Sequence, residues 1–269
     1  MTIRKKHIFA LTGGLVTTGL VGWYVFGADA EDTALRDDAS PVTNTDSLYT
    51  KSNSDRSFEE ELIKRQEDNA PLAVAVTGSS VAAGEGASDY SKTWVALLEE
   101  QLNGSDERLS VDVTNFGVSG FKISDLLSEG VIEDLIQSEP DVVLIETSVI
   151  NSYFHNEPLE ETKQSIETTA NQLEENLPEA YVLFIAPNPI SESVFSVATN
   201  DVGFDEYVFQ TEEYIVEAGW DYFDSYTSWN DEIKDTEIDL DQLLGDGVHP
   251  NDEGYQMWFD LINESVIQS

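Results

Sequence analysis

The most informative segment for predicting the fold is DVVLIE, residues 141–146. Its apolar residues run without a break, whereas a strand with one face in water would alternate polar and apolar residues, so this strand is expected to be buried on both faces. YVLFIA at residues 181–186 has the same character, and LAVAVT at residues 72–77 supplies an earlier strand. The long stretch at residues 159–177, between the two continuous apolar runs, has the spacing of a helix with a polar face. Strands alternating with helices in this way predict an α/β protein, a three-layer α/β/α sandwich around a mainly parallel sheet.

The remainder of the domain continues this alternation, and no internal repeat interrupts it. We predict further elements as follows: strands at residues 109–115 and near Tyr222 and Phe223, and helices around residues 94–102, 204–218 and 252–267.

The composition is strongly acidic. Against 13 Lys and Arg stand 53 Asp and Glu, a formal net charge of -40. Nucleic acids need cationic contacts to their phosphates, so this balance excludes them as partners, and an anionic membrane surface would repel the domain. We interpret the acidity as a solvated surface suited to concentrated salt, where charge repulsion is screened, and expect a halophilic source. The chain has no cysteine, so it forms neither disulfides nor thiolate metal sites.

The amino terminus predicts a membrane segment. Residues 8–26 are apolar or small and uncharged, and they follow Arg4, Lys5 and Lys6. Basic residues prefer the cytoplasmic side, which orients the rest of the chain outward. We therefore expect a signal anchor with one transmembrane helix at residues 1–30, a single-pass protein of the cell membrane with its catalytic domain extracytoplasmic. The alternative is secretion after cleavage at a small-residue site, residues 28–30.

An acidic, Ser- and Thr-rich stretch without hydrophobic period follows at residues 31–57 and is predicted to be a disordered linker. The folded domain should then occupy residues 58–269.

In a parallel sheet, ligands bind beyond the carboxyl ends of the strands, so residues that directly follow strands are candidates for chemistry. Gly78-Ser79-Ser80 follows the first strand. A serine on such a turn presents its hydroxyl, while neighbouring backbone N–H groups face a developing oxyanion. Ser80 is the candidate nucleophile, and Ser79 is its rival.

Two later segments offer oxyanion donors. The Gly-rich stretch at residues 115–120 follows the second strand and lets a backbone N–H approach a ligand closely. Asn151 follows the central strand, where its side-chain amide can donate another hydrogen bond. By themselves these segments are also typical of ordinary turns and helix caps.

The sequence Asp246-Gly247-Val248-His249 precedes the last helix. A serine nucleophile needs a base, commonly histidine, with an Asp to orient its ring. Of the chain's three histidines, only His249 has an acid at this spacing, since His7 lies at the membrane segment and His155 in an aromatic stretch.

Together, in this order, the segments resemble the SGNH/GDSL hydrolase family from about Leu72 to the carboxyl terminus. The resemblance implies a flavodoxin-like fold and a serine ester hydrolase that works through an acyl-enzyme. It implies this site: catalytic Ser80, Asp246 and His249, with an oxyanion hole formed by Ser80, Gly120 and Asn151.

The chain departs from the family pattern at two places. Ser79 stands where the family has Asp, which changes the hydrogen bonding of the turn. Ser152 follows Asn151 where the family has Asp, and the usual Gly two residues before the Asn is missing, so Asn156 is an alternative donor.

The expected function is hydrolysis of esters, as an esterase, lipase or carbohydrate O-deacetylase. The alternatives are O-acyl transfer to envelope glycans and a catalytically silent envelope-binding module. We expect no cofactor and no metal, because the sequence has neither an EF-hand pattern nor a His pair at zinc spacing. The expected partners are a small-molecule or glycan ester and, through the amino terminus, the membrane. No feature fixes the oligomeric state, and a monomer is expected.

Overall fold

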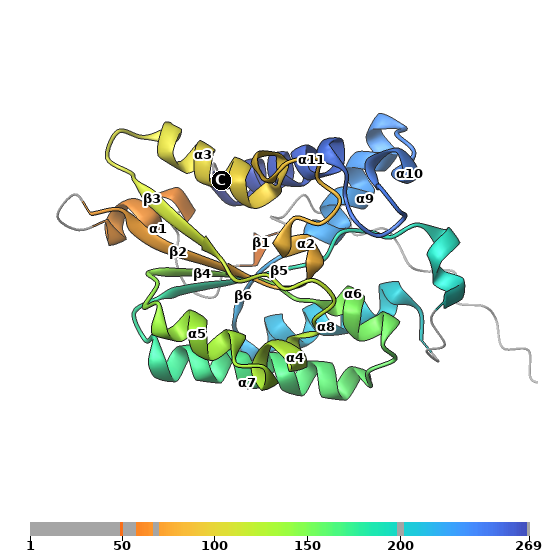
Figure 1. Cartoon of the computed structure of the whole chain (residues 1–269), viewed down its shortest axis with the longest axis horizontal. Coiled ribbons are helices and arrows are strands. Elements are labelled where there is room, and N and C mark those ends of the chain that lie inside the picture. Colours follow the sequence, from red (N-terminus) through yellow and green to blue (C-terminus); the bar gives the residue numbers. More distant parts are fainter. Residues whose placement is uncertain (1–48, 51–57, 67–69, 198–201, 268–269) are drawn as a thin grey trace, which may run out of the picture. The chain divides into compact units, whose positions relative to one another are not determined.

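The computed structural model describes residues 49–50, 58–66, 70–197 and 202–267 (Figure 1). Within them lies a sheet with the strand order β1-β6-β5-β4-β2-β3. Five strands run parallel, and β1 alone pairs antiparallel, with β6. The strands are β1 (Tyr49–Thr50), β2 (Leu72–Thr77), β3 (Val111–Asn115), β4 (Val142–Glu146), β5 (Tyr181–Ile185) and β6 (Asp221–Phe223).

Without β1, the parallel strands follow the flavodoxin-like order, in which the first strand lies between the second and the third. The α/β class with a parallel central sheet is therefore confirmed. Every residue of β4 is buried, in agreement with its continuous apolar run. The register places Val74 beside Val142 and Leu144 beside Leu183, so apolar side chains continue from strand to strand across the centre of the sheet.

Helices cover both faces of the sheet (Figure 1). On one face, α11 packs against α3 and α9, and on the other, α7 packs against α4, α5 and α8. Their bounds are α3 (Trp94–Ser105), α9 (Ser225–Thr236) and α11 (Asp252–Ile262) on the first face, and α4 (Ile123–Ser128), α5 (Val131–Gln137), α7 (Leu159–Asn176) and α8 (Phe204–Ala218) on the second.

Shorter elements connect these layers. They are α1 (Phe58–Arg65), α2 (Ser80–Ala83), η1 (Tyr90–Lys92), α6 (Val149–Phe154), η2 (Glu192–Val197), α10 (Leu240–Leu243) and the π-helical turn η3 (Asn263–Ile267). Most of them are too short to show a helical hydrophobic period. The terminal helix predicted at residues 252–267 is regular only to Ile262 and ends in η3.

Three buried tryptophans fill the face covered by α3, α9 and α11. Trp94 stacks on Trp258 at a centroid distance of 5.7 Å, and Trp229 meets Trp258 edge-on at 6.4 Å. Asn251 caps the first turn of α11 by accepting hydrogen bonds from the amides of Glu253 and Gly254. This packing and this cap fix the start of α11, directly after the loop that carries Asp246 and His249.

The amino-terminal predictions lie mostly outside the described residues. In the part of the chain that the structure describes, no helix is long and apolar enough to cross a membrane. The predicted membrane segment at residues 8–26 belongs to the part without description, as does the linker except for Tyr49–Thr50, which form β1.

Candidate active site

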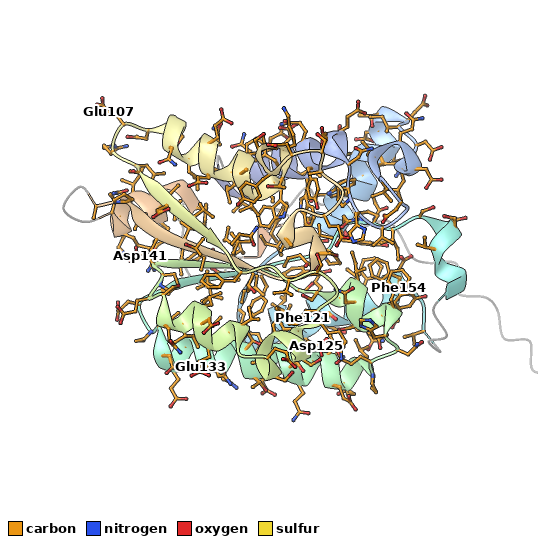
Figure 2. All side chains as sticks on the ribbon, in the orientation of Figure 1. Glu107, Phe121, Asp125, Glu133, Asp141 and Phe154 are labelled. Atoms are coloured by element: carbon orange, nitrogen blue, oxygen red, sulfur yellow. The ribbon has the colours of Figure 1, made fainter. Side chains whose placement is uncertain are left out.

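The candidate residues gather where the strand order of the sheet reverses, beyond the carboxyl ends of β2 and β4. Phe121 and Phe154 lie toward this end of the molecule, whereas Asp141, directly before β4, lies at the opposite end (Figure 2). Two backbone hydrogen bonds join the segment after β3 to β2 and to the turn that follows β2. The Val118 amide donates to the Gly78 carbonyl at 3.0 Å, and the Phe116 amide donates to the Val76 carbonyl at 2.6 Å.

The structure brings Ser80, His249 and Asp246 into one hydrogen-bonded chain. Ser80 begins α2, directly after the turn that follows β2, and its Oγ lies 2.9 Å from His249 Nε2. On the other side of the ring, His249 Nδ1 lies 2.7 Å from Asp246 Oδ2. With Nδ1 protonated, the ring donates to the carboxylate and accepts from the serine hydroxyl. This arrangement lets the imidazole take the serine proton.

Asp246 is held by its own loop. Its Oδ1 accepts from the amides of Val248 at 3.0 Å and His249 at 2.8 Å. Partial burial raises the pKa of Asp246, but the hydrogen bonds from the His249 amide and ring and from the Val248 amide outweigh it, so the pKa lies below the usual value. The carboxylate is therefore ionised at neutral pH and places a negative charge beside the imidazole ring.

Ser79 is placed differently from Ser80. Its side chain is buried and caps α2, with Oγ accepting from the Val81 amide at 3.2 Å, while its own amide donates to Glu146 Oε2 at 2.8 Å. Of the two candidate serines, only Ser80 is hydrogen-bonded to His249 among the described contacts.

The two candidate oxyanion segments also meet. Gly120 lies at the third position of a turn closed by the Phe121 amide donating to the Val118 carbonyl at 3.2 Å, and its φ of 80° is one that glycine adopts without strain. Asn151, in α6, donates from Nδ2 to the Phe121 carbonyl at 2.8 Å, which leaves its second amide hydrogen for another acceptor. Asn156 lies beyond α6, with a left-handed φ of 53°.

Among the described contacts, none joins His155 to this chain of hydrogen bonds. His155 is exposed at the carboxyl end of α6, and His7 lies outside the described residues.

Three residues that the sequence did not single out lie in or beside the site. Asn188, buried after β5, donates to the Val248 carbonyl at 2.9 Å and so holds the loop between Asp246 and His249. Glu146 is buried at the end of β4, where Oε1 accepts from the Ser148 amide at 2.9 Å in addition to the bond from Ser79. Both positions follow or end predicted strands, which is the signal that could have identified them.

The third is Glu85, which lies beside the ring of His249, with 3.8 Å between Glu85 Oε2 and Nε2. Its neighbour Gly86 allows the chain to pass close to the loop of His249, because a Cβ at this position would lie 2.4 Å from the Pro250 carbonyl oxygen and 2.9 Å from His249 Cβ. No sequence motif indicated this contact, which depends on residues far apart in the chain.

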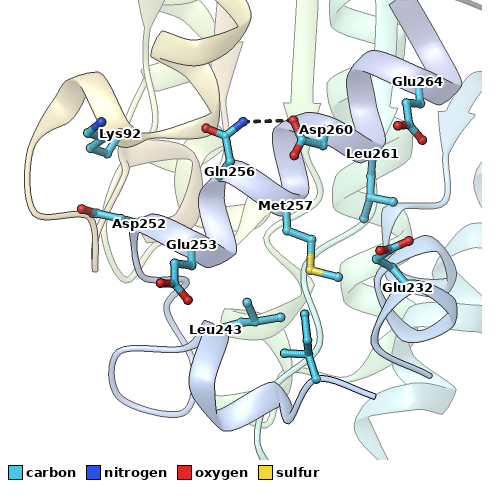
Figure 3. Close-up of a pocket in the computed structure, with 11 residues that line it drawn as sticks. Lys92, Glu232, Leu243, Asp252, Glu253, Gln256, Met257, Asp260, Leu261 and Glu264 are labelled. Atoms are coloured by element: carbon cyan, nitrogen blue, oxygen red, sulfur yellow. Dashed lines mark hydrogen bonds between the residues drawn. The ribbon is translucent and has the colours of Figure 1, made fainter. Parts of the chain in front are cut away.

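A separate cavity of about 510 Å³ lies along the outer side of α11 (Figure 3). An apolar floor that includes Leu243, Met257 and Leu261 is bordered by carboxylates, and none of Ser80, Asp246 and His249 lines it. The described residues contain no cluster of three or more His, Asp or Glu side chains that could hold a metal ion.

Several solved structures share this fold at low sequence identity. A two-domain esterase active on acetylated mannans superposes with a TM-score of 0.62 at 17% identity, covering 79% of this chain and 53% of the esterase. This chain thus spans about half of that protein. An acetylxylan esterase from Geobacillus stearothermophilus gives 0.58 at 18% identity, covering 72% of this chain and 94% of the other. A lipolytic G-D-S-L protein from Veillonella parvula gives 0.56 at 17% identity, covering 72% and 97%.

No curated protein sequence matches the chain. A sequence model of the GDSL-like lipase/acylhydrolase family, however, matches residues 76–257, which include Ser80, Gly120, Asn151, Asp246 and His249. The chain therefore belongs to the GDSL-like lipase/acylhydrolase family and is a carboxylic ester hydrolase.

Proposed function

We propose that Ser80, His249 and Asp246 are the catalytic residues of this ester hydrolase. The observation that carries the proposal is the position of the His249 ring, 2.9 Å from Ser80 Oγ and 2.7 Å from Asp246 Oδ2. A serine hydroxyl is activated when it is hydrogen-bonded to a base and a third group orients that base.

In the first half of the reaction, Ser80 Oγ attacks the ester carbonyl carbon while His249 Nε2 takes its proton. The tetrahedral intermediate collapses as the carbon–oxygen bond of the leaving alcohol breaks and His249 returns the proton to the alcohol oxygen. In the second half, water attacks the acyl-enzyme, His249 takes a proton from it, and the acid leaves as Ser80 regains its hydrogen. The ionised Asp246 stabilises the imidazolium in both halves.

Three hydrogen-bond donors stabilise the negative oxygen of the tetrahedral intermediates in this proposal: the backbone N–H groups of Ser80 and Gly120, and the side-chain amide of Asn151. The turn at Gly120 and the hydrogen bond from Asn151 to the Phe121 carbonyl support this assignment, because they hold the second and third donors in adjoining segments. Loss of one such donor commonly lowers turnover by about 10²- to 10³-fold.

O-acetyl groups on glycans are the proposed substrates. Two structures with the same fold are esterases described as acting on acetylated mannans and acetylated xylan, which supports this class. The anionic surface, at a formal charge of -40, also favours neutral glycan esters over anionic ones at low salt.

We further propose that the enzyme acts outside the cell, held at the membrane by residues 8–26. The uncharged apolar run and the basic residues before it support this placement. Protease treatment of intact cells should degrade the catalytic domain if it faces outward, and full protection would contradict the proposed orientation.

The catalytic assignment is tested by measuring acetate release from acetylated mannan, acetylated xylan and short-chain aryl esters. Wild-type protein should release acetate from at least one glycan, and Ser80→Ala should lose nearly all activity on every substrate. A Ser80→Ala protein that kept more than a few per cent of the aryl ester rate would contradict it. Analysis of the products with a free glycan acceptor present separates hydrolysis from acyl transfer.

A further inference from the structure

A buried carboxylate, that of Glu157, bonds to side chains that lie close in sequence to Gly120 and to Asn151. Glu157 follows α6 and is 7% exposed. Four side chains bond to it: Oε1 accepts from Ser124 Oγ at 2.6 Å and Lys122 Nζ at 3.1 Å, and Oε2 accepts from Ser152 Oγ at 2.8 Å and Thr162 Oγ1 at 3.0 Å.

The two oxygens of this carboxylate accept hydrogen bonds from different segments of the chain. Lys122 and Ser124 stand at the start of α4, shortly after Gly120, whereas Ser152 directly follows Asn151 in α6. The carboxylate therefore ties the start of α4 to α6, and the bond from Asn151 to the Phe121 carbonyl, at 2.8 Å, ties the same segments a second time.

The charge state of Glu157 fits this bridging role. Burial raises its pKa, but the hydrogen bonds from Ser124, Ser152, Lys122 and Thr162 outweigh that effect, and the pKa lies below its usual value. The carboxylate is thus ionised at neutral pH. Only the ionised form has acceptor sites for all four donors, because a protonated carboxyl would have to donate one bond.

We propose that Glu157 is a positioning residue that sets the separation of the Gly120 N–H and the Asn151 amide in the oxyanion hole. The inference rests on the function proposed above. It also accounts for Ser152: the position after Asn151 carries a hydroxyl, and that hydroxyl reaches the negative charge that Glu157 supplies.

The primary test is Glu157→Gln, which keeps the size of the side chain and removes its charge. If the two donors move apart, kcat on an aryl acetate should fall about tenfold or more while KM changes little, because displacements near 1 Å can cost about 10²-fold. Glu61→Gln is the matched control, since Glu61 is also 7% exposed and ion-paired, to Arg65 in α1. That variant should lose stability without losing kcat.

A double-mutant cycle with Asn151→Ala separates positioning from general stability. If Glu157 acts through the oxyanion donors, Glu157→Gln should lower kcat less in the Asn151→Ala background than in wild type. Equal effects in both backgrounds, or a folded Glu157→Gln protein with wild-type kcat, would overturn the inference. Neither result would affect the catalytic role of Ser80, which Ser80→Ala tests independently.

Should Glu157→Gln fail to fold, Ser152→Ala and Thr162→Val provide the same test with smaller changes. Each removes one hydroxyl from Glu157 Oε2, and both side chains are buried. Ser152 adjoins Asn151, whereas Thr162 lies in α7, so Ser152→Ala should reduce kcat more than Thr162→Val at a similar loss of thermal stability. The reverse order would contradict a positioning role.

Discussion

The two adjacent residues Ser79 and Ser80 have different roles, which could not be told apart from the sequence alone. Both follow the same strand, and both side chains are largely buried. The structure gives Ser80 a bond to His249 and gives Ser79 the cap of α2 and an amide bond to the buried Glu146. Ser79 replaces the Asp of the family pattern, and its hydroxyl still performs the capping that an Asp side chain can perform.

This division predicts opposite outcomes for two similar substitutions. Ser79→Ala removes one cap hydrogen bond and should lower the free energy of unfolding by about 1 kcal/mol, while kcat stays within a few-fold of wild type. Thermal unfolding and aryl ester kinetics measure the two effects, with Ser80→Ala as the inactive reference. Complete inactivity of a well-folded Ser79→Ala protein would reassign the nucleophile.

Asp246 gives a second prediction at this scale. Asp246→Asn keeps the shape of the side chain but removes the charge that stabilises the imidazolium and the acceptor that fixes the ring tautomer. We expect kcat to fall by about 10⁴-fold with little change in thermal stability. Steady-state kinetics at neutral pH check this, and a decrease of less than tenfold would show that Asp246 does not orient His249.

Among the helices and strands, the long elements and the short strand β6 could be predicted from the sequence, whereas most other short elements could not. The continuous apolar runs at β4 and β5 and the helical period of α8 predicted those elements with nearly the observed bounds. The four-residue α2 and six-residue α6 contain too few positions to show a period, and β1 is defined only by its pairing with β6.

The same limit applies to the site. Ser80, Asp246 and His249 could be proposed because each follows a recognisable local pattern. The role of Glu157 could not, since its four partners come from α4, α6 and α7 and from the residue before α4, and only folding brings them together.

The contact between α8 and the start of α9 predicts a pH dependence of stability. Burial, and then the charge of Asp224, raise the pKa of Glu212 from 4.5 to about 7. The folded state therefore binds the Glu212 proton more tightly than the unfolded state does. The resulting contribution to the free energy of unfolding is fully present below about pH 4.5 and is lost as the pH rises through about 7. Replacing Glu212 by a residue that does not ionise should therefore increase the stability of the folded protein most at high pH.

Glu212→Gln should accordingly raise the Tm relative to wild type by more at about pH 8 than at about pH 5. Differential scanning fluorimetry at the two pH values measures the difference, and Glu213→Gln, an exposed neighbour on the same helix, is the control. An equal effect of Glu212→Gln at both pH values would contradict the raised pKa.

At the scale of the whole molecule, charge is the dominant feature. A formal charge of -40 imposes self-repulsion on the folded state, and that repulsion is screened as the Debye length falls to about 3 Å at 1 M salt. The Tm should therefore rise between low salt and about 1 M, similarly in NaCl and KCl. Thermal unfolding at constant pH measures this, and a Tm that stays constant or falls would contradict the halophilic interpretation of the composition.

If His249 and Asp246 activate Ser80 as a nucleophile, Ser80 should react covalently with a reagent for activated serines. A fluorophosphonate reacts only with an activated serine, and mass spectrometry of the digested protein locates the adduct. We predict one adduct, on Ser80, in wild-type and Ser79→Ala protein and none in Ser80→Ala. Labelling at another serine, or no labelling of folded wild-type protein, would contradict the assignment of Ser80 as the nucleophile.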